Sequence, residues 1–184
     1  MKYSRSQTIE ALRKGESVDF LFFWGHQPSK DGSITKSCFS QWWIVPFNHD
    51  GIEYISAEHF MMAEKARLFE DAEMRHKIIT AKTPKEAKVL GRKVRNFDPT
   101  IWDAHKYDIV IKANELKFSQ NPELGAYLKA TNNQTIVEAS PFDRIWGIGM
   151  SQNNPKALDP EQWNGENLLG YVLMEVREDL LNQE

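Results

Sequence analysis

The sequence lacks the features that mark secreted, membrane-spanning and disulfide-stabilised proteins. Cys38 is the only cysteine among 184 residues, so no disulfide can form within the chain. The opening residues, Met-Lys-Tyr-Ser-Arg-Ser, contain no apolar run like that of a secretory signal. No apolar stretch approaches the ~20 residues that a transmembrane helix needs. These absences predict a soluble protein of the cytoplasm, with no membrane partner.

Metal-binding motifs and a strong charge of one sign are missing as well. The sequence has neither a Cys-x-x-Cys pair nor histidines spaced as zinc ligands, so we expect no metal and no cofactor. The net charge of −3 argues against binding of nucleic acid by the whole surface, although a local basic patch is compatible with it.

The composition that remains is typical of a globular enzyme or binding domain. Hydrophobic residues make up 41% of the chain and charged residues 27%. We see no repeat, low-complexity tract or linker, so we expect a single domain over residues 1–184 with a core of about 18–182. The predicted fold is α+β, mostly helical, with a small antiparallel sheet.

Local signals place the elements of this fold. Asp50-Gly51 between two β-prone runs predicts a hairpin. Ser56, Asp71, Thr83 and Asp98 each stand where a helix N-cap is expected. The expected elements are helices over 4–14, 56–69, 71–80, 99–118 and 122–130, one from 84 and one closing the chain from about 169, with strands at 18–24, 42–47, 52–55 and 135–139.

The helix predicted over residues 56–69 carries an unusual pair of side chains. Glu58 and Lys65 fall on the same face as Met61, Met62 and Leu68 at helical spacing. They are about 10 Å apart along the axis, which suits holding something between them better than neutralising each other. A slightly rotated helix, in which both side chains reach solvent or local partners, is an equally good interpretation. His59 lies to one side of this face, and a lone histidine is more often structural than a ligand.

A second candidate region covers residues 138–149, where Asp143 stands beside Trp146 and two glycines. Gly147 and Gly149 suit either a close approach of the backbone to a ligand or a simple turn. Asp143 suits either chemistry or the capping of a turn. Asn167 follows in a segment that enters the closing helix, where free backbone amides suit a phosphate.

Basic and aromatic residues supply the remaining candidates. Residues Lys85, Lys88, Arg92 and Arg95 line one side of the helix expected from residue 84. A solvated face is the favoured interpretation, and contact with a phosphate or a nucleic-acid backbone is the alternative. Trp102 lies in the first turn of its helix, where a tryptophan either lines a pocket or packs against a domain edge.

Taken together, these residues resemble the NADAR family, also called the YbiA-like N-glycosidases. The resemblance runs from about Phe20 to Leu181. It is carried by Phe23-Trp24, Phe39-Ser40, Tyr54, Ser56-x-Glu58-His59, Lys65, Gly91-Arg92, Trp102, Lys117-Phe118, Leu128-x-x-Thr131, Glu138, Asp143-x-x-Trp146-Gly147-x-Gly149, Gly165-x-Asn167-x-Leu169-Gly170 and Leu173-Met174-x-x-Arg177.

The resemblance implies cleavage of an N-glycosidic bond between ribose and a base. Two substrate classes are associated with the family: ADP-ribose attached to guanine bases of nucleic acid, which we prefer, and phosphorylated ribosylaminopyrimidine intermediates of riboflavin synthesis. A module that binds ADP-ribose without cleaving it is the third possibility. Gln41 departs from the family, which often has Asn after the Phe-Ser pair. The implied catalytic residues are Glu58, Lys65 and Asp143, and the implied substrate-binding residues are Trp24, Gln41, His59, Arg92, Trp102, Trp146, Gly147, Gly149 and Asn167.

A mechanism can be written for these residues. Breaking the ribosyl C1–N bond builds positive charge on the sugar, which Glu58 would stabilise unless it serves instead as the base for water. Asp143 would supply a proton to the departing base. Lys65 would hold anionic oxygens as an ammonium, or form a Schiff base with C1 of the opened sugar as a neutral amine.

Overall fold

The computed structural model describes residues 1–182 and divides the chain into two compact units. One unit is the continuous segment Ser40–Pro122, and the other combines Met1–Phe39 with the chain from Glu123 onward. The described residues form seven α-helices, an antiparallel pair of strands and a parallel pair. The mostly helical α+β class is therefore confirmed, and the parallel pair is an addition to the expected antiparallel sheet.

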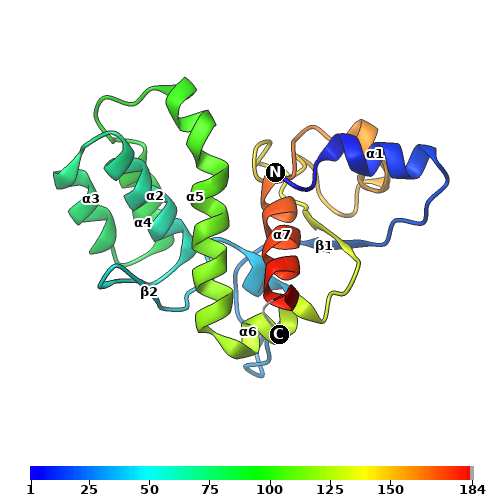
Figure 1. Ribbon diagram of the computed structural model, residues 1–184, viewed down its shortest axis with the longest axis horizontal. Helices are drawn as coiled ribbons and strands as arrows, with labels where there is room; N and C mark the ends of the chain where they lie inside the picture. The colour runs from blue at the N-terminus through cyan, green and yellow to red at the C-terminus, as the bar shows by residue number, and fades with distance from the viewer. Residues whose placement is uncertain (183–184) are drawn as a thin grey trace. The chain divides into compact units, whose positions relative to one another are not determined.

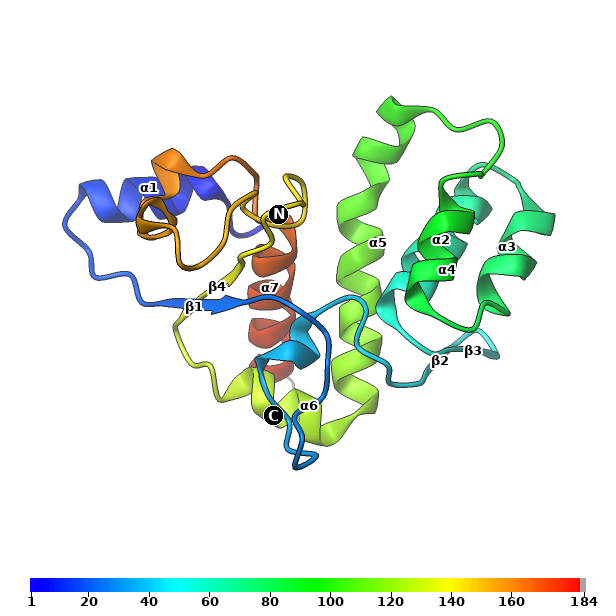
Figure 2. The same ribbon diagram turned by 180° about the vertical axis from the view of Figure 1, so that it is seen from behind.

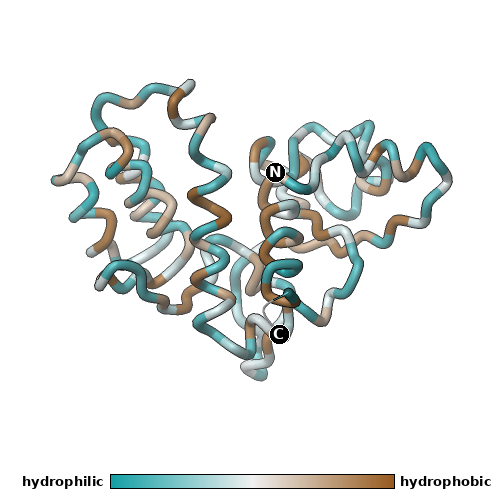
Figure 3. The backbone as a smooth tube through the Cα atoms, viewed as in Figure 1, coloured by the Kyte–Doolittle hydropathy of each residue, from teal (hydrophilic) through white to brown (hydrophobic). Residues whose placement is uncertain are grey.

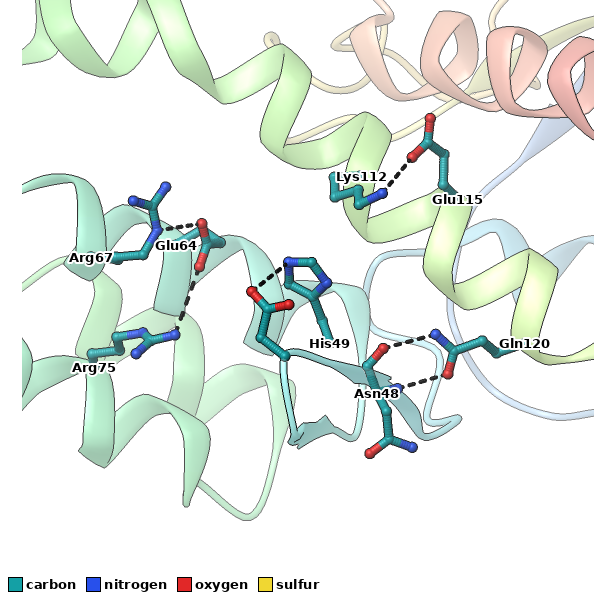
Figure 4. A network of polar contacts seen from close by, with 9 residues as sticks. Asn48, His49, Glu64, Arg67, Arg75, Lys112, Glu115 and Gln120 are labelled. Carbon is teal, nitrogen blue, oxygen red and sulfur yellow. Dashed lines mark hydrogen bonds and ion pairs between the residues drawn. The ribbon is translucent and has the colours of Figure 1, made fainter.

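The predicted hairpin opens the unit of residues 40–122. Strands β2 (Phe47–His49) and β3 (Ile52–Tyr54) pair antiparallel, and both turn residues have positive φ, 50° at Asp50 and 75° at Gly51. The prediction of a strand over 42–47 is wrong except at Phe47: β2 covers Phe47–His49, and its last two residues were expected in the turn. The chain at residues 41–42 forms a turn instead. In Figure 4 the amide of Gln120 pairs with both the N–H and the carbonyl of Asn48, as a neighbouring strand would.

Helix α2 (Ala57–Leu68) is the centre of this unit. It contacts α3 (Ala72–Ile79), α4 (Pro84–Gly91) and α5 (Pro99–Gln120), which surround it in Figure 1. Burial is not confined to the face that carries Glu58, Met61 and Met62, because nine residues of the helix are buried and they lie all around it. Its Glu64 accepts from Arg67 at 2.7 Å and lies 4.0 Å from Arg75 of α3 (Figure 4).

The predicted N-caps of these helices are confirmed. Side chains of Ser56, Asp71, Thr83 and Asp98 accept backbone N–H groups of the first turns of α2, α3, α4 and α5. The expected basic side of α4 is shorter than predicted, because the helix ends at Gly91. Arg95 lies beyond it and pairs instead with Asp71 at 2.7 Å.

The other unit is built around a parallel strand pair. Strand β1 (Phe20–Phe23) lies beside β4 (Thr135–Glu138), with Phe20 opposite Thr135 (Figure 2). Strand β1 is less buried than expected: only Phe23 is fully buried, and Trp24 lies past its end with 58% of its surface exposed. Within residues 1–182, β4 is the one strand that pairs with β1, so the other edge of β1 has no neighbouring strand there.

Helix α7 (Leu168–Asn182) contacts β4, and the remaining helices of this unit are α1 (Arg5–Arg13) and α6 (Pro122–Lys129). Figure 3 shows hydrophobic and hydrophilic segments alternating along the helices, in keeping with partial burial. The segment from 140 to 163, predicted to be irregular, contains two short 3-10 helices, Pro155–Leu158 and Pro160–Gln162. None of the helices described over residues 1–182 is long and apolar enough to cross a membrane.

Candidate active site

The predicted site residues are divided between the two units. The unit of residues 40–122 contains Gln41, Glu58, His59, Lys65, Arg92 and Trp102, and the other contains Trp24, Asp143, Trp146, Gly147, Gly149 and Asn167.

Lys65 lies among aromatic rings. Its Nζ is 4.0 Å from the centroid of the Phe97 ring and 5.6 Å from that of Trp102. Burial lowers the pKa of the Lys65 amine, and the positive charge of Arg92 lowers it further. Both effects favour the neutral amine, which is the nucleophilic form. Phe97 was not among the predicted site residues, because it stands in the turn between α4 and α5 and follows no helical or strand pattern.

Glu58 occupies the first turn of α2 and is 2% exposed. Its backbone N–H donates to the carbonyl of Gln41 at 2.9 Å. A carboxylate in the first turn of a helix is favoured by the helix dipole. Glu58 therefore does not reach solvent, and this acid belongs to the interior of the unit.

Gln41 is also buried, and it takes part in a polar cluster that the sequence did not reveal. Its Oε1 accepts from Asn114 Nδ2 at 2.9 Å, and Lys117 Nζ donates to the carbonyl of Ser40 at 2.9 Å. Asn114 and Lys117 are each fully buried on α5. The signal that would have found them is their spacing, since they interrupt the buried face formed by Val110, Ala113 and Phe118.

His59 has a structural role. It is fully buried, with Nδ1 2.7 Å from Ser56 Oγ and Nε2 3.1 Å from the carbonyl of Ala81. A carbonyl only accepts, so Nε2 carries the proton and Nδ1 accepts from the serine hydroxyl. Burial lowers the pKa of His59, which keeps the ring in this neutral form. Both ring nitrogens are used within the fold, so the predicted substrate contact through His59 is not supported by its geometry.

Arg92 forms the C-cap of α4 and is exposed. Lys88 of the same helix places its Nζ 5.7 Å from the Trp42 ring centroid. Lys85 is exposed as well, so α4 presents three cations along its length and at its end. This arrangement fits both the solvated face that the sequence favoured and the binding of a polyanion.

In the other unit, Asp143 shapes the turn that carries Trp146. Its Oδ1 accepts the backbone N–H groups of Ile145 at 2.9 Å and Trp146 at 2.8 Å, while Ser140 Oγ accepts the N–H of Asp143. This is the turn-capping use of a loop aspartate that was the alternative to chemistry. Asp143 is only partly buried, so this role leaves its second oxygen available to a ligand.

Gly147, Gly149 and Asn167 hold the same loop against β4. A Cβ on Gly147 would lie 2.8 Å from the carbonyl of Glu138, and Gly149 has φ of +66°. Asn167 is fully buried, accepts from the N–H of Glu138 and donates to the carbonyl of Ile136, both at 2.9 Å. The amide of Asn167 is thus engaged by a strand, and its predicted substrate contact is not supported.

Trp24 lies at the end of β1 and meets a second exposed aromatic ring. Its ring centroid is 6.3 Å from that of Phe142, and the two planes are inclined at 54°. Phe142 is 86% exposed. The two rings therefore offer an accessible aromatic surface next to Asp143 in the chain.

No group of three or more His, Cys, Asp or Glu side chains suited to a metal ion occurs among residues 1–182.

Comparison with known proteins identifies relatives along most of the chain. The protein is 47% identical over 169 residues to N-glycosidase R617 of Acanthamoeba polyphaga mimivirus, a match covering 89% of this chain and 98% of the relative. It is 33% identical to N-glycosidase YbiA of Escherichia coli strain K12, covering 96% of each chain. The riboflavin biosynthesis protein PYRR of Arabidopsis thaliana is 32% identical over 133 residues, which span 70% of this chain and 20% of that protein.

The fold agrees with these matches. The NMR structure of the E. coli protein YbiA superimposes with a TM-score of 0.72 at 29% identity, covering 90% of this chain and 86% of that one. The NADAR domain model matches residues 22–181, which include every predicted site residue. The chain belongs to the NADAR family.

Proposed function

We propose that this protein hydrolyses the N-glycosidic bond that joins ADP-ribose to guanine bases of nucleic acid. The general activity, hydrolysis of an N-glycosyl bond, follows from family membership and from the names of relatives that match over nearly their whole length. The observation that carries the proposal is the presence on α2 of a buried carboxylate, Glu58, and a partly desolvated amine, Lys65.

The chemistry uses the charge that develops on the sugar. As the C1–N bond breaks, C1 of the ribose gains positive charge, which the Glu58 carboxylate stabilises across a short distance in a water-poor interior. A water oxygen then bonds to C1 and gives its proton to a base, while the departing guanine gains a proton. The products are free ADP-ribose and an unmodified guanine, so atoms and charge balance. A role of Asp143 as the proton donor is part of the proposal.

Lys65 supports this reaction in one of two ways. In its charged form it holds the oxygens of the ribose or of a phosphate. In its neutral form, which burial and Arg92 favour, its nitrogen bonds to C1 as the sugar ring opens and the C1–N bond to guanine breaks. The two amine protons pass to the ring oxygen and to the departing guanine, and one water then hydrolyses the Schiff base to ADP-ribose and the free amine. Trapping with borohydride separates the two, because only the Schiff base is reduced to a stable adduct at Lys65.

A nucleic-acid substrate is supported by the cations of α4. Lys85, Lys88 and Arg92 follow one another at the surface of the unit that carries Glu58 and Lys65. Phosphates on either side of the modified base would bind to these cations, and this binding would weaken as the salt concentration rises.

The second candidate substrate is a phosphorylated ribosylaminopyrimidine, and the observation that favours it is the riboflavin biosynthesis name of the PYRR relatives. Both substrates contain a ribosyl C1–N bond, so the same α2 groups serve either one. They differ in size and in the number of phosphates outside the reacting sugar.

The deciding experiment is a time course on both substrates run in parallel. We expect release of ADP-ribose from ADP-ribosylated guanine DNA, and loss of this activity in Lys65→Ala and Glu58→Gln. Lys77→Ala and Glu73→Gln are matched controls, since these residues pair with each other on the surface of α3. Turnover of the aminopyrimidine alone would replace the proposed substrate, and binding of ADP-ribose with no turnover of either would replace the enzyme by a binding module.

A further inference from the structure

Two amide side chains meet inside the unit of residues 40–122. Gln41 is 6% exposed and Asn114 is fully buried. Asn114 Nδ2 donates to two acceptors, the carbonyl of Val110 at 2.8 Å and Oε1 of Gln41 at 2.9 Å. The pair links the turn that contains Gln41 to the middle of α5.

These contacts fix which way both amides point. A backbone carbonyl only accepts, so the atom of Asn114 beside Val110 must be the NH2 group. That group then needs an acceptor on Gln41, which must be Oε1. The amide orientation of Gln41 is therefore set by Val110, through Asn114, and its Nε2 is the atom left for another partner.

Nε2 of Gln41 is a buried donor that has no hydrogen-bond partner among residues 1–182. Buried amide groups are nearly always paired, because leaving one unpaired is destabilising. The Oδ1 of Asn114 is also buried without a hydrogen-bond partner among these residues. Rotating both amides by 180° would therefore exchange the unpaired atoms without pairing them. A buried group of this kind needs an explanation, and a role in the chemistry of a functional site is one that proteins use.

The backbone of Gln41 ties this donor to the candidate catalytic helix. The carbonyl of Gln41 accepts the N–H of Glu58 at 2.9 Å, in the first turn of α2. On the other side, Lys117 holds the carbonyl of Ser40 at 2.9 Å. The turn at residues 40–41 is thus fixed between α2 and α5, and its side chain is fixed by Asn114.

We propose that Asn114 is a positioning residue that makes Gln41 present its NH2 group to an oxygen of the substrate ribose. The ribose is the part of the substrate on which Glu58 acts, and Gln41 is bonded to the backbone of Glu58. An oxygen acceptor on the ribose is common to both candidate substrates, so the inference does not depend on which base is released. It rests on the proposed function only in placing the sugar beside Glu58.

The test is a double-mutant cycle read by the affinity for ADP-ribose. Gln41→Met and Asn114→Leu each remove one member with little change of volume, and the loss of one hydrogen bond should weaken the Kd about tenfold. If Asn114 acts through Gln41, the double variant should be no weaker than the single ones. Asn121→Leu, at the C-cap of α5, is the matched control, since the Asn121 amide donates to the carbonyls of Pro46 and Lys117 and has no contact with Gln41 among the described hydrogen bonds. The Kd of this variant should equal that of the wild type. Additive losses, or an unchanged Kd in Asn114→Leu, would overturn the proposal.

A spectroscopic measurement covers the case in which Asn114→Leu fails to fold. The side-chain NH2 signals of Gln41 are assigned in 1H–15N spectra by their absence in Gln41→Met. Saturation with ADP-ribose should shift these NH2 proton signals downfield, as formation of a hydrogen bond does. The variant Gln41→Glu, which offers an oxygen in place of the NH2, should bind ADP-ribose at least tenfold more weakly. Unmoved signals or full affinity in Gln41→Glu would refute the inference. Neither readout needs turnover, so wild-type protein that binds in this way but cleaves neither substrate would contradict the proposed function and not this one.

Discussion

Gly170 is the residue whose replacement tests the packing of α7 most directly. A Cβ at this position would lie 2.1 Å from the carbonyl oxygen of Ile136 and 2.5 Å from Nδ2 of Asn167. The first is strand backbone, which cannot rotate away. The second belongs to the amide that pairs with β4 on both sides, through Ile136 and Glu138. Gly170→Ala must therefore displace α7 from the strand and, because the new methyl group also meets the Asn167 amide, break these hydrogen bonds.

The size of the effect follows from three contributions. Overpacking of this kind costs about 1–3 kcal/mol. Loss of the two Asn167 hydrogen bonds costs roughly 1 kcal/mol each. The higher helix propensity of alanine offsets at most about 1 kcal/mol of this loss. We expect Gly170→Ala to lower the free energy of unfolding by roughly 2–4 kcal/mol, a large part of the total for a protein of ordinary stability.

Gly91→Ala is a matched control in the other unit. Its Cβ would also come within 2.1 Å of a heavy atom, but that atom is Sδ of Met62, near the end of a flexible side chain. Rotation of Met62 relieves most of the clash, so the loss should be about 1 kcal/mol or less. The two variants carry the same substitution and the same closest distance, so comparing them distinguishes a clash with backbone from a clash with a movable side chain.

The assay is unfolding in urea combined with amide hydrogen exchange. Exchange reports on each unit separately, which matters because the two need not unfold together. Gly170→Ala should reduce protection in α7 and β4, and Gly91→Ala should leave these elements unchanged. Equal losses in the two variants, or a larger loss at Gly91, would refute the reasoning.

Three further predictions concern charges and the hairpin. Pairing with Arg95 holds the pKa of the Asp71 carboxyl well below its usual range, so the ionised pair stabilises the folded protein. This stabilisation is present at neutral pH and is lost as the pH falls below about 4. Asp71→Asn should lower the melting temperature at pH 7 and flatten its decline in acid, and an unchanged acid profile would contradict this. Gly51→Ala should destabilise the protein by about 1 kcal/mol in urea unfolding, because the residue has φ of +75°, whereas a neutral result would argue against a required left-handed turn. Arg92→Met should raise the pKa of the Lys65 amine, measured from the pH dependence of its chemical modification, since one of the two causes of its lowered pKa is removed; the same pKa in the variant would show that burial alone sets it.

The sequence predicted best what a few neighbouring residues decide. The Asp50-Gly51 turn, the Ser56 cap and the Thr83-Pro84 helix start depend on local backbone preferences, and all three occur as expected. Pairing of β1 with β4 was not predicted, because the residues of neither segment indicate which strand it pairs with. The surroundings of α2 were also missed, since burial on every side depends on three other helices and not on its own pattern.

The site was predicted to a similar extent. The buried position of Glu58 and the partial burial of Lys65 agree with the unusual pair noticed in the sequence. The contact of the His59 ring with the carbonyl of Ala81, and those of the Asn167 amide with β4, could not be foreseen, because they join side chains to backbone groups distant in the sequence. Phe97 and Asn114 were overlooked for different reasons. Phe97 lies in a turn without periodicity, and Asn114 lies on a helix face whose other residues are mostly apolar.

The order of the two units along the chain has a consequence for synthesis. Phe20 and Thr135, which face each other across the parallel pair, are 115 positions apart, and the whole of Ser40–Pro122 lies between them. That continuous unit has all its own elements available once residue 122 has left the ribosome, whereas β1 must wait for β4 to be made. The segment with Glu58 and Lys65 is therefore able to fold first, and the N-terminal strand spends most of translation without its partner, as the part of the nascent chain most exposed to mispairing.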